Sequence, residues 1–311
     1  MGQLINSLKS GDKVGSHFLI KEKRLMDFKN KPGQYMHLIL GDRSGEIEAK
    51  IWDGADDYIQ ICQAGKIVFV EGEVVAFRDS NQMRITGMRI SPQDEVNLAD
   101  FIACSPRPLE EMDYELRQYI DDLRSVELKA LAIAFIDSVW YPLFCKAPAA
   151  QSYHHAYAGG LLEHTLGVMK LAGKLSEVYA LDRDLLMIGA MFHDVGKVKE
   201  MQLFPGIQYT DEGKFLGHIV LGIQMLDQLM ASIEMDAMTK NQILHMITSH
   251  HGEYEWQSPK RPMFLEAKIL HLADMMDAEV FKFKSAVPAE EGGAWSNFMK
   301  SIGNQVFINQ K

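Results

Sequence analysis

Five histidines and two aspartates recur through the second half of this 311-residue chain, mostly within apolar, helix-forming segments. Apolar residues three, four and seven positions away put nearly all of them on helix faces that should turn inward. A buried charge or an unpaired imidazole is costly unless a partner compensates it, and a metal shared by all of them would do so. In chain order these candidate metal ligands are His164, His193, Asp194, His218, His250, His251 and Asp274.

The surroundings of individual members favour this interpretation over a purely structural one. His250 extends an apolar stripe made by Ile243 and Ile247, and Asp194 adjoins His193 at the end of an apolar helix. A lone histidine on an apolar face is more often a hydrogen-bonded core residue than a ligand. The whole series, with an adjacent His-Asp pair in its middle, disfavours that alternative. Histidine and aspartate are both good ligands for borderline and hard divalent cations.

The series resembles the HD-domain superfamily of metal-dependent phosphohydrolases, an all-helical fold. More narrowly, two blocks are similar to the YhaM family of 3′→5′ exoribonucleases. They are Tyr-His-His-Ala-Tyr-Ala-Gly-Gly-Leu-Leu-Glu-His-Thr at 153–165 and Ser-His-His-Gly at 249–252. The resemblance covers nearly the whole chain and implies an OB-fold ahead of the HD domain. The 3′→5′ direction of digestion comes from this resemblance alone.

The resemblance also implies how the ligands divide between two metal ions. Asp194 would be catalytic as the bridge, because a carboxylate has two oxygens and can join cations about 3.5–4 Å apart. A hydroxide between the ions would attack phosphorus in a single displacement. Resemblance favours Mn²⁺, although histidine-rich ligation also suits Fe²⁺, Co²⁺, Ni²⁺ or Zn²⁺. The first ion would be held by His164, His193, Asp194 and Asp274, and the second by Asp194, His218, His250 and His251.

Three basic residues near the ligands are candidates for contacts with the substrate. Lys197 follows Asp194 by three positions and could bind phosphate or donate a proton, the alternative being a solvated lysine at a helix end. His154 and His155 precede the first ligand helix, and we expect His155 to contact the terminal nucleotide or its phosphate. The alternative for both histidines is an ordinary surface position.

Residues 14–92 read as short β-strands. The run Tyr35–Leu40 precedes a Gly-Asp-Arg-Ser-Gly turn, after which Ile47, Ala49 and Ile51 alternate with charged residues. Five strands with a short helix between the third and fourth is the order of an OB barrel, a fold that often binds single strands. We expect its substrate contacts to act collectively, although each candidate could instead belong to the barrel core; the candidates are Tyr35, His37, Trp52, Phe77, Arg78 and Arg84.

The predicted organisation is therefore a five-stranded OB-like barrel followed by an all-helical HD domain. Two Ser-Pro steps bracket a connector, after which the apolar period becomes helical. We expect an OB-fold nucleic-acid-binding domain at 1–92, a linker and connecting helix at 93–126, and the helical HD phosphohydrolase domain at 127–311. Helices are predicted at 109–123, 127–139, 160–180, 183–195, 217–231, 236–250 and 262–281, with a loop or small hairpin at 201–214.

Charge and cysteine content indicate where a nucleic acid could bind and which covalent or metal sites are unsupported. Residues 1–92 carry 13 Lys and Arg against 12 Asp and Glu, whereas the remainder carries 19 against 30. A surface for a polyanion is therefore expected in the N-terminal part. Three dispersed cysteines support neither a disulfide framework nor a thiolate zinc site. With no signal peptide and no apolar run of membrane-spanning length, we expect a cytoplasmic protein without a membrane partner.

Three classes of function compete on these observations. The first is an exonuclease on single-stranded RNA, with single-stranded DNA as a further substrate, releasing nucleoside 5′-monophosphates. The second is an HD phosphohydrolase of small nucleotides, such as a cyclic dinucleotide or a dNTP. The third is a binding protein with a structural metal. A strand-binding barrel favours a polymer, the chain contains no Gly-Tyr-Pro, and the intact ligand series disfavours the third class. The sequence leaves the oligomeric state open.

Overall fold

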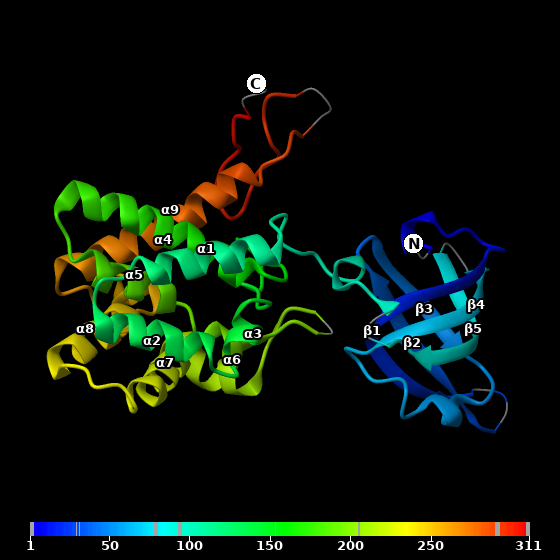
Figure 1. Ribbon diagram of the computed structural model, residues 1–311. Coiled ribbons are helices and arrows are strands. Elements are labelled where there is room, and N and C mark those ends of the chain that lie inside the picture. The colour runs from blue at the N-terminus through cyan, green and yellow to red at the C-terminus, as the bar shows by residue number, and fades with distance from the viewer. Residues whose placement is uncertain are drawn as a thin grey trace. The chain divides into compact units, whose positions relative to one another are not determined.

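The computed structural model describes residues 3–28, 30, 32–77, 80–92, 95–152, 154–204, 206–289 and 293–308. The chain forms two compact units, one that includes Met1–Cys104 and one that includes Ser105–Gln202 and Gln208–Lys311. Long strands gather in the first unit and long helices in the second (Figure 1). Within the described residues, no helix is long and apolar enough to span a membrane.

The first unit is a closed barrel in the strand order β1-β2-β3-β5-β4, which closes because β1 also pairs with β4. Among the described strand pairs of the barrel, β3 and β5 run parallel and the others antiparallel. The short 3₁₀ helix η2 (Ala55–Tyr58) lies between the third and fourth strands, so the predicted OB-like order is confirmed. The strands are β1 (Lys13–Asp27), β2 (Gln34–Asp42), β3 (Gly45–Ile51), β4 (Ile67–Phe77) and β5 (Ser80–Ile90).

Alternation along the strands separates the barrel core from its surface. Leu38, Ala49 and Val70 are fully buried on β2, β3 and β4. The residues that alternate with the buried ones along each strand point outward. The strand register places His37 opposite Lys50, and Lys50 opposite Arg84. Three adjacent strands therefore carry a row of basic side chains on one outer face.

The second unit is helical, as predicted, around one large apolar core. The side chains of α5 from Leu185 to Phe192 are all buried, which makes this helix the centre of the unit. The helices are α1 (Leu109–Asp121), α2 (Val126–Ile136), α3 (Tyr141–Phe144), α4 (Gly160–Tyr179), α5 (Arg183–Phe192), α6 (Lys197–Glu200), α7 (Asp211–Met230), α8 (Ala237–Ser249) and α9 (Leu265–Lys284).

The segment predicted as linker and connecting helix, 93–126, divides between the two units. Its first part, as far as Cys104, groups with the barrel. The helix α1 instead packs on the helical core through Met112, Leu116 and Ile120, which are nearly inaccessible to solvent. This helix is thus part of the helical unit in its packing.

One helix begins earlier than its apolar pattern indicates. A small hairpin of β6 (Met201–Gln202) and β7 (Gln208–Tyr209) occupies the predicted loop, but α7 already starts at Asp211. Thr210 caps it by accepting a hydrogen bond from the Gly213 amide. A kink follows at Gly217, whose φ of 69° is left-handed, and the regular period resumes only after it. Because the kink interrupts the helical period, the apolar pattern did not indicate the part of α7 that precedes Gly217.

Candidate metal centre

The helical unit brings all seven predicted ligands to one place, from five different helices. His164 lies on α4, His218 on α7 and Asp274 on α9, while the other four stand at helix ends. His193 and Asp194 directly follow α5, and His250 and His251 directly follow α8. A helix end is a natural site for a ligand, because the side chain leaves the apolar stripe while its backbone stays anchored.

Asp194 lies between two groups of histidines and presents one oxygen to each. Its Oδ2 is 3.4 Å from His193 Nε2 and 3.6 Å from His164 Nε2. Its Oδ1 is 3.4 Å from His218 Nε2 and 3.6 Å from His250 Nε2. This side chain is only 3% exposed, and the division of its two oxygens is what a bridging carboxylate requires.

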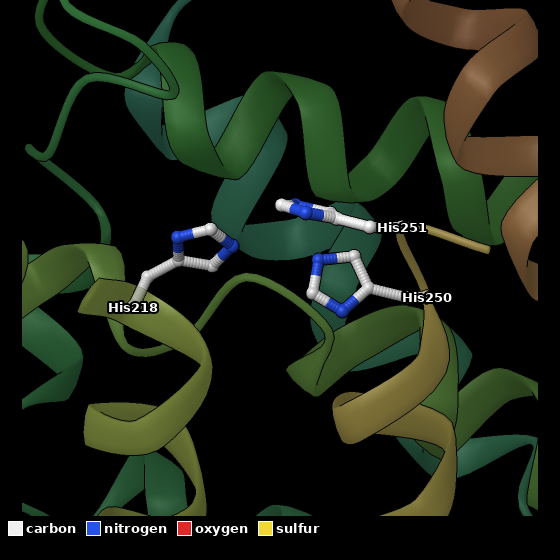
Figure 2. A group of neighbouring side chains, drawn as sticks. All are labelled: His218, His250 and His251. Atoms are coloured by element: carbon white, nitrogen blue, oxygen red, sulfur yellow. The ribbon is translucent and has the colours of Figure 1, made fainter. Parts of the chain in front are cut away.

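Each group has the compactness of a metal site. The potential ligand atoms of His164, His193 and Asp274 lie within 4.8 Å of one another, as do those of the other three histidines. Figure 2 shows His218 from α7 turned toward His250 and His251 from the end of α8. We name these the inner group (His164, His193, Asp274) and the outer group (His218, His250, His251).

Three buried atoms at this centre have no hydrogen-bond partner among the described residues: Asp194 Oδ1, His218 Nε2 and His250 Nε2. A buried polar atom left unsatisfied costs about 1–3 kcal/mol, so three of them at one point need an explanation. All three can donate a lone pair, and Asp194 lies within 3.6 Å of both imidazoles. A divalent cation would satisfy all three, so the residues present fit a metal.

The opposite edge of every histidine in the two groups is held by an oxygen atom of the protein. The Nδ1–H of His164 donates to Asp277 at 2.8 Å, and that of His218 pairs with Glu200 at 3.1 Å. Backbone carbonyl oxygens at 2.7–2.8 Å hold the Nδ1 atoms of His193, His250 and His251. Such bonds orient the ring and leave Nε2 for the metal, as in known metal sites.

Sequence reasoning missed the two carboxylates that hold these rings. Asp277 follows Asp274 by one helical turn on α9, and Glu200 follows Lys197 at the same spacing. This spacing from a predicted site residue was the available signal. Both carboxylates have lowered pKa values, because hydrogen bonds from histidines outweigh the effect of burial.

The electrostatics differ between the two groups. Burial favours neutral His164, yet Asp274 and Asp277 outweigh it and raise the pKa of this imidazole to about 9. In the outer group, burial lowers the pKa of His250 and lowers that of His251 to about 4. Burial also opposes ionisation of Asp194, but Lys197 and His193 hold the pKa of this carboxyl well below its usual range.

Lys197 is part of the centre and not a solvated lysine. Its side chain is 12% exposed, and its ammonium lies 2.6 Å from Asp194 Oδ2. Despite burial, the neighbouring carboxylate raises the pKa of Lys197, so its charge is retained. The side chain also lines a pocket of about 540 Å³ beside the outer group, together with His154, Tyr209, His218, His251 and Trp256.

His155 does not lie where we expected a substrate contact. It is 5% exposed, and both of its ring nitrogens are engaged by protein groups. Nε2 is 3.2 Å from Asp277 Oδ2, and Nδ1 is 2.9 Å from the Tyr157 hydroxyl. Both ring nitrogens therefore have partners within the protein, whereas its neighbour His154 lines the pocket beside the outer group.

The predicted aromatic contacts of the barrel lie next to each other on its surface. The Tyr35 and Trp52 rings stack with centroids 4.7 Å apart, and Trp52 is 37% exposed. The Lys50 ammonium lies over the Trp52 ring at 5.3 Å and over the Phe77 ring at 5.1 Å. Arg84 is exposed and pairs with Glu73 at 3.3 Å. The predicted contact Arg78 lies outside the described residues.

Known proteins similar to this chain indicate the class of protein to which it belongs. The family model for the HD domain matches residues 161–279, the segment that contains all seven candidate ligands. The 3′-5′ exoribonuclease YhaM of Oceanobacillus iheyensis is 33% identical over 96% of this chain and 94% of its own length. The YhaM of Bacillus subtilis is 34% identical over 96% of this chain and 95% of its own. The chain therefore belongs to the YhaM family.

Proposed function

We infer that this protein is a metal-dependent 3′→5′ exoribonuclease that hydrolyses single-stranded RNA to nucleoside 5′-monophosphates. The observation that carries this is likeness over nearly the full length to relatives named for that activity, with the buried His-Asp centre in the matching segment. Single-stranded DNA is a further candidate substrate. We expect the enzyme to act in the cytoplasm.

We propose that the centre holds two ions, with Mn²⁺ favoured. The inner group would hold one, the outer group the other, and Asp194 would bridge them. When bound, such ions supply a nucleophilic hydroxide near neutral pH and Lewis-acid stabilisation of the charge that develops on the phosphate. Histidine-rich ligation favours Mn²⁺, Fe²⁺, Co²⁺, Ni²⁺ or Zn²⁺ over Mg²⁺.

The protein's own groups have distinct tasks in this proposal. Asp194, kept ionised by Lys197 and His193, sets the spacing of the two groups. Lys197 would neutralise a phosphate oxygen, or give a proton to the 3′-oxygen as the phosphorus–oxygen bond breaks. The phosphate then stays with the released nucleotide, which leaves as a 5′-monophosphate. The adjacent pocket, with His154 and Trp256 in its lining, would receive the terminal nucleotide.

The barrel favours a polymer over a small nucleotide as substrate. Its outer face combines the Tyr35–Trp52 stack with the basic row of Lys50 and Arg84. Stacking on aromatic rings beside positive charges is how single strands are bound without sequence preference. We propose Tyr35, Trp52 and Arg84 as contacts for the RNA strand, and a mononucleotide would need none of them.

The test compares substrates by their ends. With Mn²⁺, the enzyme should shorten a linear 5′-labelled RNA as a ladder and should leave a circular RNA of the same sequence uncut. A duplex without a 3′ overhang should resist. An RNA blocked by a 3′-phosphate serves as a further check on the polarity. Rapid cutting of the circle, or strong preference for a cyclic dinucleotide or a dNTP, would overturn this function in favour of a small-nucleotide phosphohydrolase.

A further inference from the structure

A chain of hydrogen bonds runs from His164 away from the metal centre into the helical unit. His164 Nδ1 is 2.8 Å from Asp277 Oδ2, and the same oxygen is 3.2 Å from His155 Nε2. His155 Nδ1 is 2.9 Å from the Tyr157 hydroxyl, which donates to Glu163 at 2.9 Å. We call Asp277, His155, Tyr157 and Glu163 the support network. It includes none of the predicted metal ligands.

The backbone around this network has a positive φ at one residue and closely approached glycines at two others. His155 has a φ of 48°, in the left-handed region that non-glycine residues rarely adopt. A Cβ at Gly160 would lie 2.0 Å from the His155 carbonyl oxygen, and one at Gly167 would lie 2.2 Å from Asp277 Oδ1. The neighbour of Gly160 is backbone, so a side chain there would displace the His155 segment, whereas a side chain at Gly167 would displace the Asp277 carboxylate.

Two aromatic rings also pack near the buried His155 ring. Its centroid is 4.1 Å from that of Phe281 and 5.6 Å from that of His164. Strain kept at a buried polar residue beside a metal centre points to a role in that centre. Since His155 and His164 share one oxygen of Asp277, a change at one ring is transmitted to the other.

We propose that His155 is a positioning residue for the inner metal site. By holding Asp277 Oδ2 in place, it fixes the ring orientation of His164 and thereby sets the affinity of the inner group for its ion. Tyr157 and Glu163 hold His155 in turn. This inference rests on the proposed function for the presence of a metal, but it concerns affinity and not the choice of substrate.

The experiment is a calorimetric titration of metal-free protein with Mn²⁺. Asp277→Asn should weaken binding at the inner group 10- to 100-fold, the usual loss when the partner of a ligand histidine is removed. His155→Ala should weaken the same site roughly tenfold, because Asp277 is kept but is less well held. His155→Gln should recover part of this loss, since its amide can still donate to Asp277. Binding at the outer group should stay unchanged.

The control variant is His245→Ala, which removes a half-buried histidine that accepts a hydrogen bond from the Met263 amide outside the centre. It should titrate like wild type. Thermal melting of each metal-free variant checks folding. If His155→Ala does not fold, Tyr157→Phe removes one hydroxyl of the network and should still weaken the inner site, by less than the roughly tenfold loss expected when a direct partner of a ligand is removed.

Kinetics distinguish positioning from substrate contact. For His155→Ala, saturating Mn²⁺ should restore kcat, and KM for RNA should stay at the wild-type value. A folded variant with wild-type Mn²⁺ affinity would overturn the proposal, as would a raised KM with unchanged affinity. Failure of the proposed function shows differently: wild-type protein would bind Mn²⁺ and leave RNA intact, and the titrations would still decide the role of His155.

Discussion

The inner and outer groups of the metal centre both rely on histidines but differ in the carboxylates that accompany them. The inner group has its own carboxylate in Asp274 and a second one, Asp277, behind His164. The outer group has three histidines and shares Asp194, and one carboxylate, Glu200, lies behind His218. Both His164 and His193 are fully buried, whereas His218 and His251 line the pocket.

This difference in charge and exposure indicates how tightly each group should hold its ion. Negative charge is concentrated around the inner group, as the raised pKa of His164 shows, and the same charge attracts a cation. The outer group has less charge and faces the space that a substrate would enter. We therefore expect an inner ion that is held tightly and an outer ion that is exchanged more easily and approaches the phosphate.

The largest effect is expected where the two groups meet. Asp194→Asn keeps the shape of the side chain but removes the charge that both groups share. We expect kcat to fall roughly 10³-fold or more, since a metal contributes several kcal/mol to the transition state. Metal content should fall at both groups. An active variant with two bound ions would contradict the proposal that Asp194 bridges them.

The second prediction compares matched deletions, one in each group. His164→Ala should abolish tight Mn²⁺ binding, whereas His218→Ala should leave one tightly bound ion and lose the weaker one. Both should lower kcat roughly 100-fold, because either ion alone supplies only part of the stabilisation. Elemental analysis after dialysis gives the number of ions. Equal retention of metal in the two variants would contradict the proposed difference in affinity.

The third prediction uses pH. A ligand must be deprotonated to bind metal, and His164, with a pKa of about 9, carries a proton at pH 7 in the metal-free protein. Affinity at the inner group should therefore rise roughly tenfold per pH unit between pH 6 and pH 8. Burial lowers the pKa values of His250 and His251, so metal binding by these two ligands should displace fewer protons and affinity at the outer group should rise less steeply. Mn²⁺ titrations at three pH values measure both slopes.

The smallest effect is expected from a change in the barrel, which contains none of the metal ligands and so serves as a control for the two groups. Trp52→Ala removes one member of the exposed stack and should raise KM for RNA roughly 5- to 10-fold, near the lower limit for one stacked base. Metal affinity and hydrolysis of bis-p-nitrophenyl phosphate should stay unchanged. Loss of metal in this variant would show that the barrel supports the centre and does more than bind the strand.

The sequence by itself determined which residues could form a metal centre and in which kind of fold. Each candidate ligand interrupts or ends an apolar helical stripe, and that pattern is local, so it can be read without knowing how helices pack. The alternation of Ile47, Ala49 and Ile51 likewise predicted a strand of the barrel. Local periodicity was enough because inward-facing positions recur at fixed spacing along each element.

Only the tertiary structure decided which groups support those ligands. Asp277 meets His164 across 113 residues and His155 across 122, distances in sequence that no local pattern connects. His155 precedes the first ligand helix and was expected at the substrate, yet it pairs with Asp277 on α9 instead. The physical reason is that a hydrogen bond between helices depends on how closely they approach. That approach is set by glycines such as Gly167 and by the packing of the whole core.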